Sequence, residues 1–243
     1  MLESKFHPVQ QEIATLTDLA MPHDAPPRLI CLDAVGTLFG VTDSVGAAYK
    51  IVAAQFGVDI PAAAIDQAFY AAFKSAPPMT FPGADPADIP QLEYDWWAEL
   101  ARQTFGALNL VAAFPNFDAF FRELYADFAT ARPWFVYPDV VPALTAWRSQ
   151  GIPLAVVSNY DTRLYPVLAA LDLNQWFDTV TISTEVGAAK PNTEIFHQAI
   201  APYAVPPTTC WHIGVCRSMD YNCANEAGLW GIWLNGGEYI KSV

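Results

Sequence analysis

Short apolar runs alternate with helix-length segments over much of this chain. The apolar runs occupy residues 28–33, 152–157, 179–182, 209–213 and 231–234. The segments between the later runs, at 139–150, 162–171, 193–201 and 219–227, have the length of surface helices, and Gly151 and Gly228 stand where helix C-caps are expected. Strands that alternate with helices form a parallel sheet covered on both faces. The sequence therefore predicts an α/β fold with a Rossmann-like parallel-sheet core.

A long insertion after the first apolar run interrupts this alternation. Its helical patterns lie at 44–56, 62–74, 91–105 and 117–130, with a proline-rich stretch between the second and the third. We expect an all-helical cap at 41–135, inserted into a core formed by 28–40 and 136–235. Residues 1–27 are expected to be a loose extension with one or two helical turns within 10–20, and residues 236–243 are expected to be a C-terminal tail. Translation could start at Met1 or at Met21.

The composition limits the classes of partner. Hydrophobic residues make up 53% and charged residues 15%, which suits a large buried core. The net charge is 12 − 25 = −13 without a Lys/Arg-rich run, so we expect no nucleic-acid partner. No apolar run reaches the roughly 18 residues of a membrane span, and no stretch resembles a secretory signal, so we expect no membrane insertion and a cytoplasmic location. The four cysteines form no close pair, which argues against zinc.

Polar side chains follow several of the predicted strands. Asp33 ends the first, Ser158 and Asn159 end the second, Lys190 follows the third and Asp220 follows the fourth. Ligands of such sheets bind outside the carboxyl ends of the strands, so these groups are expected to meet. A carboxylate can attack an electrophile and form a covalent ester or acyl-phosphate, while a hydroxyl, an amide and an ammonium hold an anion. Lys190 would favour the ionised form of Asp33.

These residues, in this order, resemble the four motifs of the haloacid dehalogenase-like hydrolase family. The matching stretches are 33–38 (Asp-Ala-Val-Gly-Thr-Leu), Ser158-Asn159, Lys190-Pro191 and the loop 214–220. The resemblance covers about residues 28–235 and is greatest, by layout, to the subgroup with a helical cap between the first two motifs, to which mammalian haloacid dehalogenase-like hydrolase domain-containing proteins belong. It implies that Asp33 is the nucleophile, that Lys190 is catalytic and binds the substrate anion, and that Asp220 supports a magnesium ion. The other substrate-binding residues it implies are Gly36, Thr37, Ser158 and Asn159.

Two positions depart from the phosphatase pattern of that family. Val35 stands where phosphatases of the family carry a second aspartate as general acid and base. Loss of such a proton-transferring group typically lowers the rate ~10²–10⁴-fold. Val215 stands where the fourth motif carries its first acidic magnesium ligand, and Cys223 replaces a small residue. Asp33, the backbone carbonyl of Val35 and Asp220 would be the remaining metal ligands. We therefore expect magnesium to bind weakly or not at all.

Three interpretations follow for a small anionic substrate, phosphorylated or halogenated. Metal-independent dehalogenation fits Val35, although dehalogenases carry Ser-x-Asn where this chain has Val215, Cys216 and Arg217. A weakened phosphatase fits the nucleophile and the anion-binding groups. A catalytically degraded binding or partner protein on the same scaffold fits the loss of both acids. The sequence leaves open a monomer or a homodimer.

Other polar residues carry weaker hypotheses. The Arg217 guanidinium could fill the vacated metal position and pair with Asp33 or Asp220, or point to solvent. His197 and His212 are expected to be structural. The candidates for a halide-binding arginine in the cap are Arg102, Arg122 and Arg132.

Overall fold

The computed structural model describes residues 12–19 and 25–235. Its centre is a parallel, six-stranded sheet with the strand order β1-β8-β7-β2-β5-β6. The strands are β1 (Glu12–Ile13), β2 (Leu29–Leu32), β5 (Leu154–Ser158), β6 (Thr179–Ile182), β7 (Cys210–Gly214) and β8 (Trp230–Leu234). The α/β fold with a parallel-sheet core is thereby confirmed.

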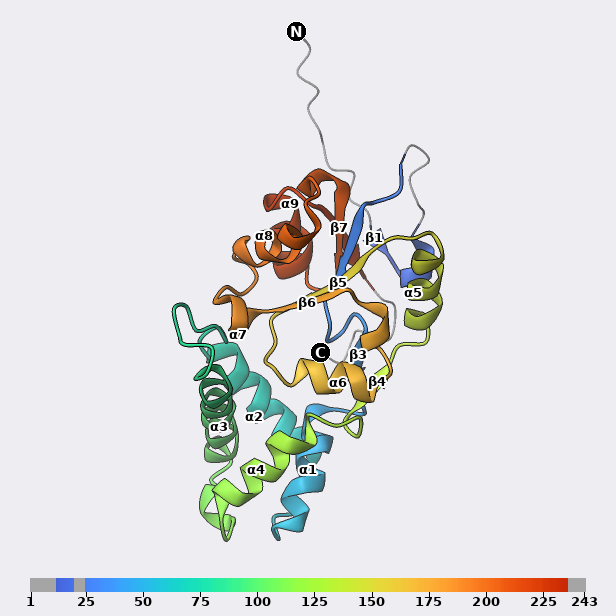
Figure 1. The fold of residues 1–243 in the computed structure, drawn as a ribbon. Helices are drawn as coiled ribbons and strands as arrows, with labels where there is room; N and C mark the ends of the chain where they lie inside the picture. The colour runs from blue at the N-terminus through green and yellow to red at the C-terminus, as the bar shows by residue number, and fades with distance from the viewer. Residues whose placement is uncertain (1–11, 20–24, 236–243) are drawn as a thin grey trace.

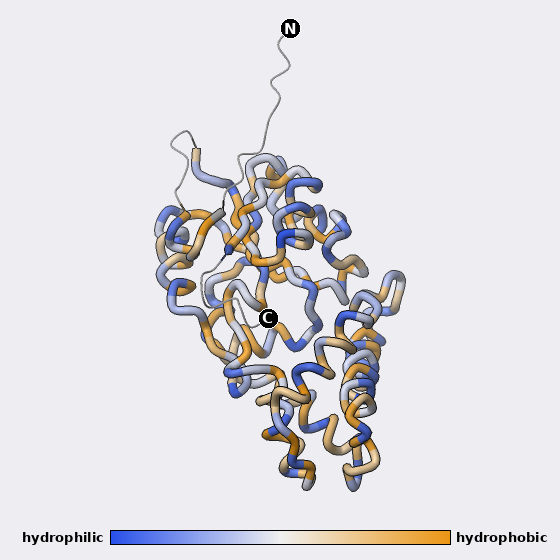
Figure 2. Tube along the Cα trace, turned by 180° about the vertical axis from the view of Figure 1, so that it is seen from behind, coloured by the Kyte–Doolittle hydropathy of each residue, from blue (hydrophilic) through white to orange (hydrophobic). Residues whose placement is uncertain are grey.

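Alternate side chains of β2 pack on opposite faces of the sheet, as the two-residue period of a strand requires. Ile30 and Leu32 belong to a hydrophobic cluster with α5 (Val140–Ser149) and α6 (Leu164–Ala170). Leu29 and Cys31 belong to a second cluster with α8 (Glu194–Ile200) and α9 (Cys223–Glu226). Figure 1 shows α5 on one side of the sheet and α8 and α9 on the other, and Figure 2 shows hydrophobic residues along the central strands. Both faces of the sheet are therefore buried.

The insertion between β2 and β5 contains four longer helices that lie together beyond one end of the sheet (Figure 1). They are α1 (Val45–Gln55), α2 (Ala62–Ser75), α3 (Ile89–Ala107) and α4 (Phe117–Asp127). Ser44 and Asn116 cap α1 and α4 with side-chain acceptors. The helices enclose a hydrophobic cluster of their own, rich in aromatic rings such as Phe105 and Phe120. We call α1–α4 the helical unit.

A two-stranded antiparallel sheet joins the helical unit to the core. It pairs β3 (Phe39–Val41) with β4 (Trp134–Val136), so the chain leaves and re-enters the core side by side. The sequence did not predict these strands, because three residues are too few to show a period. Among the described helices, none is long and apolar enough to span a membrane.

The expectation of a loose N-terminal extension is wrong for residues 12–19. Strand β1 pairs with β8, whereas the 3-10 helix η1 (Leu16–Asp18) agrees with the expected helical turn within 10–20. Ile13, Leu16 and Leu19 are buried in the cluster that also contains α5. The backbone N–H of Leu16 donates to Asp139 at 2.7 Å, which ties the segment to the start of α5. The rest of the predicted extension within 1–11 and 20–24, and the predicted tail 236–243, lie outside the described residues.

The predicted helix at 219–227 is divided in the structure. A π-helix, η6 (Arg217–Asn222), leads into the short helix α9. The wider π turn carries Asp220, and π turns often occur at functional sites. The remaining short elements on the core are α7 (Ser183–Val186) and the 3-10 helices η3 (Asn174–Trp176), η4 (Ala201–Tyr203) and η5 (Pro207–Thr209); η2 (Val111–Ala113) belongs to the insertion.

Candidate active site

Asp33 lies directly after β2, where the backbone turns sharply. Its N–H donates to the carbonyl of Ile213 on β7, which fixes it at the end of the sheet. Gly36 has φ +87°, in the left-handed region that favours glycine, and a Cβ there would lie 3.0 Å from Val215. Glycine is therefore required to bring the chain around the nucleophile position.

Ser158 and Lys190 hold one oxygen of the Asp33 carboxylate. Oδ1 accepts a hydrogen bond from Ser158 Oγ at 3.1 Å and one from Lys190 Nζ at 2.7 Å. Among the described residues, none donates to Oδ2, and the Asp33 side chain keeps 12% of its surface exposed. One carboxylate oxygen is thus anchored and the other is free to react.

Lys190 is the buried cation at the centre of the site. Its ammonium donates to Asp33 Oδ1, to Asp220 Oδ1 at 2.6 Å and to the carbonyl of Val157 at 3.1 Å. Burial opposes its charge, but the two carboxylates outweigh burial and raise the pKa of Lys190. All three of its protons therefore have acceptors, and the site residues from three loops converge as the sequence predicted.

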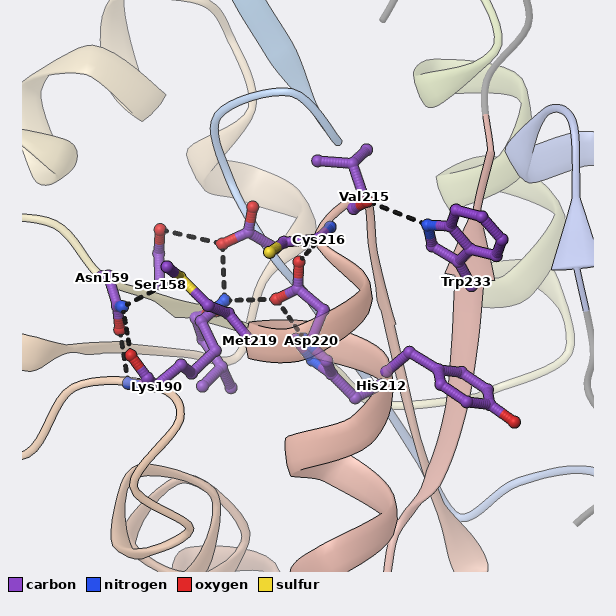
Figure 3. Close-up of polar contacts among 12 residues, drawn as sticks. Ser158, Asn159, Lys190, His212, Val215, Cys216, Met219, Asp220 and Trp233 are labelled. Carbon is purple, nitrogen blue, oxygen red and sulfur yellow. Dashed lines mark hydrogen bonds and ion pairs between the residues drawn. The ribbon is translucent and has the colours of Figure 1, made fainter. Parts of the chain in front are cut away.

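Asp220 has no free oxygen. Oδ1 accepts from Lys190 and lies 3.0 Å from His212 Nε2, while Oδ2 accepts the N–H of Cys216 at 2.9 Å (Figure 3). The close approach requires Gly214, because a Cβ there would lie 2.3 Å from Asp220 Cγ. Burial alone would raise the pKa of Asp220, but Lys190 and the hydrogen bond from His212 hold it well below its usual range.

Asp33 and Asp220 share the ammonium of Lys190, but their pKa values shift in opposite directions. Burial raises the pKa of Asp33; Lys190 opposes that rise, and the charge of Asp220 adds to it. Since Asp220 has the additional donors, it is the carboxylate that ionises more readily. Two coupled acids with pKa values pushed apart are typical of catalytic sites.

His212 is buried behind Asp220, on β7. Burial lowers its pKa, so it is neutral and donates through Nε2, and its ring contacts Phe196 edge-on at 4.6 Å between centroids. Its Nδ1 has no hydrogen-bond partner in the described part of the chain. The sequence suggested a structural histidine but gave no sign of its bond to Asp220, because the contact depends on the π-helical turn.

Asn159 and Thr37 were predicted to bind substrate. Both ends of the Asn159 amide bind the Lys190 backbone: Nδ2 donates to the Lys190 carbonyl at 2.8 Å, and Oδ1 accepts the Lys190 N–H at 2.7 Å (Figure 3). Asn159 therefore fixes the loop that carries Lys190. The hydroxyl of Thr37 is buried beside Gly36 and, within the described residues, has no hydrogen-bond partner. The roles of Gly36, Thr37, Ser158 and Asn159 towards a substrate stay predictions.

The side chains beside Asp33 offer few oxygen ligands to a magnesium ion. Val35 and Val215 are partly buried and pack against the main hydrophobic cluster, so neither position supplies a side-chain oxygen. The described residues contain no group of three His, Cys, Asp or Glu side chains that could hold a metal. Both oxygens of Asp220 already accept protein hydrogen bonds, and magnesium needs several free oxygen ligands.

Arg217 does not fill the position of the missing metal ligand. Its side chain is exposed, and its guanidinium carbon lies 5.4 Å from the ring centroid of Trp233. Within the described residues it forms no ion pair with Asp33 or Asp220, so the pairing hypothesis is wrong. Lys190 neutralises these carboxylates instead.

The cap arginines do not reach the site either. Arg102 pairs with Asp118 in an exposed ion pair, and Arg132 pairs with the partly buried Asp127 at the end of α4. Arg122 is exposed.

A nucleophile-like aspartate after the first central strand, with a buried lysine beside it and an inserted helical unit, defines a class of α/β hydrolase. Residues 27–214 match the model of the haloacid dehalogenase-like hydrolase family, and the chain belongs to that family. It is 33% identical over 221 residues to haloacid dehalogenase-like hydrolase domain-containing protein 3 of Bos taurus, covering 90% of this chain and 86% of that protein. It is 34% identical over 113 residues to glyceraldehyde 3-phosphate phosphatase of Methanopyrus kandleri, covering 46% and 47%.

Solved structures share the fold. L-2-haloacid dehalogenase from Xanthobacter autotrophicus, with chloropropionic acid covalently bound, has a TM-score of 0.62 at 20% identity, covering 84% of this chain and 75% of that one. A phosphatase from Thermococcus onnurineus has a TM-score of 0.58 at 20% identity, covering 85% of each chain. The fold is therefore common to dehalogenases and phosphatases.

Proposed function

We propose that this protein is a metal-independent hydrolase that forms a covalent ester on Asp33 with a small halogenated carboxylate. The main support is the geometry of the Asp33 carboxylate: Oδ1 accepts hydrogen bonds from Ser158 and Lys190, whereas Oδ2 accepts none from the described residues. A held carboxylate presents its free oxygen in one direction, which is what an in-line displacement requires. The covalent chloropropionic acid in the Xanthobacter autotrophicus dehalogenase supports this chemistry for the shared fold.

The reaction has two steps. Oδ2 of Asp33 attacks the carbon that carries the halogen, the carbon–oxygen bond forms, and the halide leaves with the electron pair of the broken bond. Water then attacks the ester carbonyl carbon, which is Cγ of Asp33. The hydroxy acid and one proton are released, and the Asp33 carboxylate returns.

The charge of the site favours a carboxylate substrate over a phosphate ester. Asp33 and Asp220 contribute −2 and Lys190 contributes +1, so the resting site carries −1 with His212 neutral. An ester with a carboxylate substrate leaves −1 on Asp220, Lys190 and the substrate together, because Asp33 becomes neutral. An acyl-phosphate leaves −2 or close to it, and buried charge without a partner is costly. Phosphatases of this kind offset that charge with magnesium.

The helical unit is proposed to act as a cap. Its position beyond one end of the sheet supports a boundary near residues 41 and 135, with the core at 28–40 and 136–235 (Figure 1). A cap that covers Asp33 excludes bulk water from the first step. The proposed substrate is a small anionic metabolite of the cytoplasm. The protein is proposed to act there as a monomer or a homodimer.

The test is halide release from 2-chloropropionate, measured with a chelator and with added magnesium. We expect the same rate in both, and we expect Asp33→Asn to abolish it, with a loss of at least ~10⁴-fold, because an amide is not a nucleophile here. Asp59→Asn, at an exposed position of the helical unit, is the matched control and should keep the wild-type rate. Magnesium-dependent release of phosphate from phosphate esters without any halide release would contradict the proposal.

A second candidate is a non-catalytic binding protein on this scaffold. The observation that favours it is that Ser158 and Lys190 both donate to Asp33, while Lys190 also donates to Asp220, which leaves few polar groups free. It predicts that 2-chloropropionate binds without turnover and that Asp33→Asn binds it as well as the wild type does. Turnover that depends on Asp33 excludes it.

A further inference from the structure

Helix α3 of the helical unit forms hydrogen bonds with the loop that follows Ser158. Glu93, which is fully buried, accepts the N–H of Thr162 at 3.0 Å and the hydroxyl of Thr184 at 2.5 Å. Its second oxygen accepts the hydroxyl of Thr162. Thr162 lies between β5 and α6 and Thr184 lies in α7, so every one of these donors belongs to the core.

Trp97, one turn further along α3, contacts the same loop. Its Nε1 donates to Asp161 at 2.6 Å, and Asp161 also accepts two bonds from the guanidinium of Arg163, at 2.9 and 2.6 Å. Arg163 is 8% exposed, and its guanidinium carbon lies 3.9 Å from the ring centroid of Tyr125 on α4. We call Glu93, Trp97, Asp161, Thr162, Arg163 and Thr184 the joint.

The joint is made of polar groups that only the docked arrangement satisfies. Within the described residues no cation forms an ion pair with the buried Glu93 carboxylate, so its three hydrogen bonds with Thr162 and Thr184 offset its desolvation. The N–H of Thr162 in turn has no other acceptor among its described bonds. Buried polar groups of this kind fix one geometry, because a shifted loop would leave both sides unpaired.

The joint is continuous with the reacting groups along the chain. Asp161 and Thr162 follow Ser158, which binds Asp33, and Asn159, whose amide holds the Lys190 backbone. Ser183, next to Thr184, donates to the Met79 carbonyl at 2.9 Å and to the Tyr160 carbonyl at 3.3 Å. The position of the 158–163 loop therefore sets both donors on Asp33.

We propose that Glu93 is a positioning residue: docked on Thr162 and Thr184, it fixes the loop that places Ser158 and, through Asn159, Lys190 on Asp33. The expected effect of Glu93 on kcat rests on the proposed hydrolysis at Asp33, whereas its expected effect on the position of the loop does not. The acceptor oxygens matter in this role, rather than the volume or the charge of the side chain.

The experiment compares Glu93→Leu with Glu93→Gln. Leucine fills similar space without an acceptor, whereas the glutamine oxygen can still accept from Thr162 and Thr184 while its amide donates to a rotated Thr162 hydroxyl. We measure hydrogen exchange of the backbone amides at 159–163 and kcat for halide release. Glu99→Leu, at an exposed position on the same helix, is the matched control.

Faster exchange at 159–163 in Glu93→Leu, with near-wild-type exchange in Glu93→Gln and Glu99→Leu, is the expected result. In the same variant kcat should fall by roughly 10- to 100-fold, because misplaced donors near a nucleophile lower the rate by such factors. Thr184→Val removes one bond only and should show a smaller increase in exchange; it carries the test if Glu93→Leu does not fold.

Wild-type exchange in Glu93→Leu, or equal losses in the leucine and glutamine variants, would overturn the role of Glu93. A wild type without turnover would refute hydrolysis at Asp33, and the exchange measurements would still decide the role of Glu93. The two failures are thus distinguishable.

Discussion

Lys190 carries the single positive charge that two buried carboxylates share. Asp220 receives additional donors from His212 and the Cys216 N–H, so Asp33 is the acid that keeps its proton more strongly. This arrangement ties the reactivity of Asp33 to pH, because only the carboxylate form is a nucleophile.

The acid limb of activity follows from the raised pKa of Asp33. We expect kcat/KM for halide release to be highest above that pKa and to fall about tenfold per pH unit below it, since protonation removes the nucleophile. The midpoint should lie above 3.8, the ordinary pKa of an aspartate. The measurement is a pH profile of kcat/KM from about pH 4 to 9, over the range in which circular dichroism shows the protein folded. A midpoint at or below 3.8 would refute the charge arrangement.

Magnesium affinity should depend on the two valines beside Asp33. We expect no heat of binding for the wild type at millimolar magnesium in titration calorimetry, because Asp220 has no free oxygen. Val35→Asp combined with Val215→Asp adds two oxygen donors next to Asp33 and should create measurable binding. Val41→Asp, on β3, supplies one added carboxylate at a position other than 35 and 215 as a control. Millimolar or tighter binding by the wild type would show that Asp33 and Asp220 suffice.

The convergence of the main site residues was predictable, whereas their finer contacts were not. Asp33, Ser158, Lys190 and Asp220 follow strands that run parallel, and the ends of parallel strands meet at one edge. The bond between His212 and Asp220 and the two bonds from Asn159 depend on loop geometry that has no local sequence pattern. The sequence left open whether Arg217 pairs with the carboxylates or points to solvent, because its distance along the chain from Asp220 does not define its direction on a π turn.

At the scale of elements, predictability followed length and burial. Strands β5 and β7 are buried throughout and mostly apolar, and they were predicted within about two residues because buried parallel strands give continuous apolar runs. The edge strand β6, which has two threonines and is only partly buried, was also predicted. Strands β1, β3 and β4 have two or three residues each and form only because a partner strand supplies their hydrogen bonds. Residues 12–19 are an example, since β1 forms by pairing with β8 and the following residues are held by burial of Leu16 and Leu19 in the core.

Strand β1 and helix η1 should contribute measurably to stability. Leu16 is 1% exposed, so we expect Leu16→Ala to lower the free energy of unfolding by about 2–5 kcal/mol through lost burial and the cavity it leaves. Thr17→Ala, at the exposed neighbouring position, should change it by no more than about 0.5 kcal/mol. Urea unfolding followed by circular dichroism compares the two variants. Equal midpoints would mean that the segment does not pack on the core in solution.

At the scale of the whole molecule, the helical unit encloses one hydrophobic cluster and the sheet carries one on each face. The chain crosses between them at β3 and β4, and the polar joint provides a further contact. The hydrophobic pattern predicted both units, because the apolar side chains of each helix and strand pack into the clusters of their own unit. The joint could not be predicted, since Glu93 and Thr162 are 69 residues apart and neither stands in a motif.

The net charge of −13 should slow the arrival of an anionic substrate. Because the whole molecule repels a carboxylate, we expect kcat/KM for 2-chloropropionate to rise roughly two- to tenfold when the ionic strength is raised from about 10 to about 150 mM, with kcat nearly unchanged. The neutral substrate 2-chloropropionamide has no charge to be repelled and serves as the control, so its kcat/KM should not change. Halide release is measured for both at constant pH with a salt whose anion is not detected in the assay. A fall in kcat/KM with salt for the carboxylate alone would show instead that a local positive field at the entrance, stronger than the overall charge, guides the substrate to Asp33.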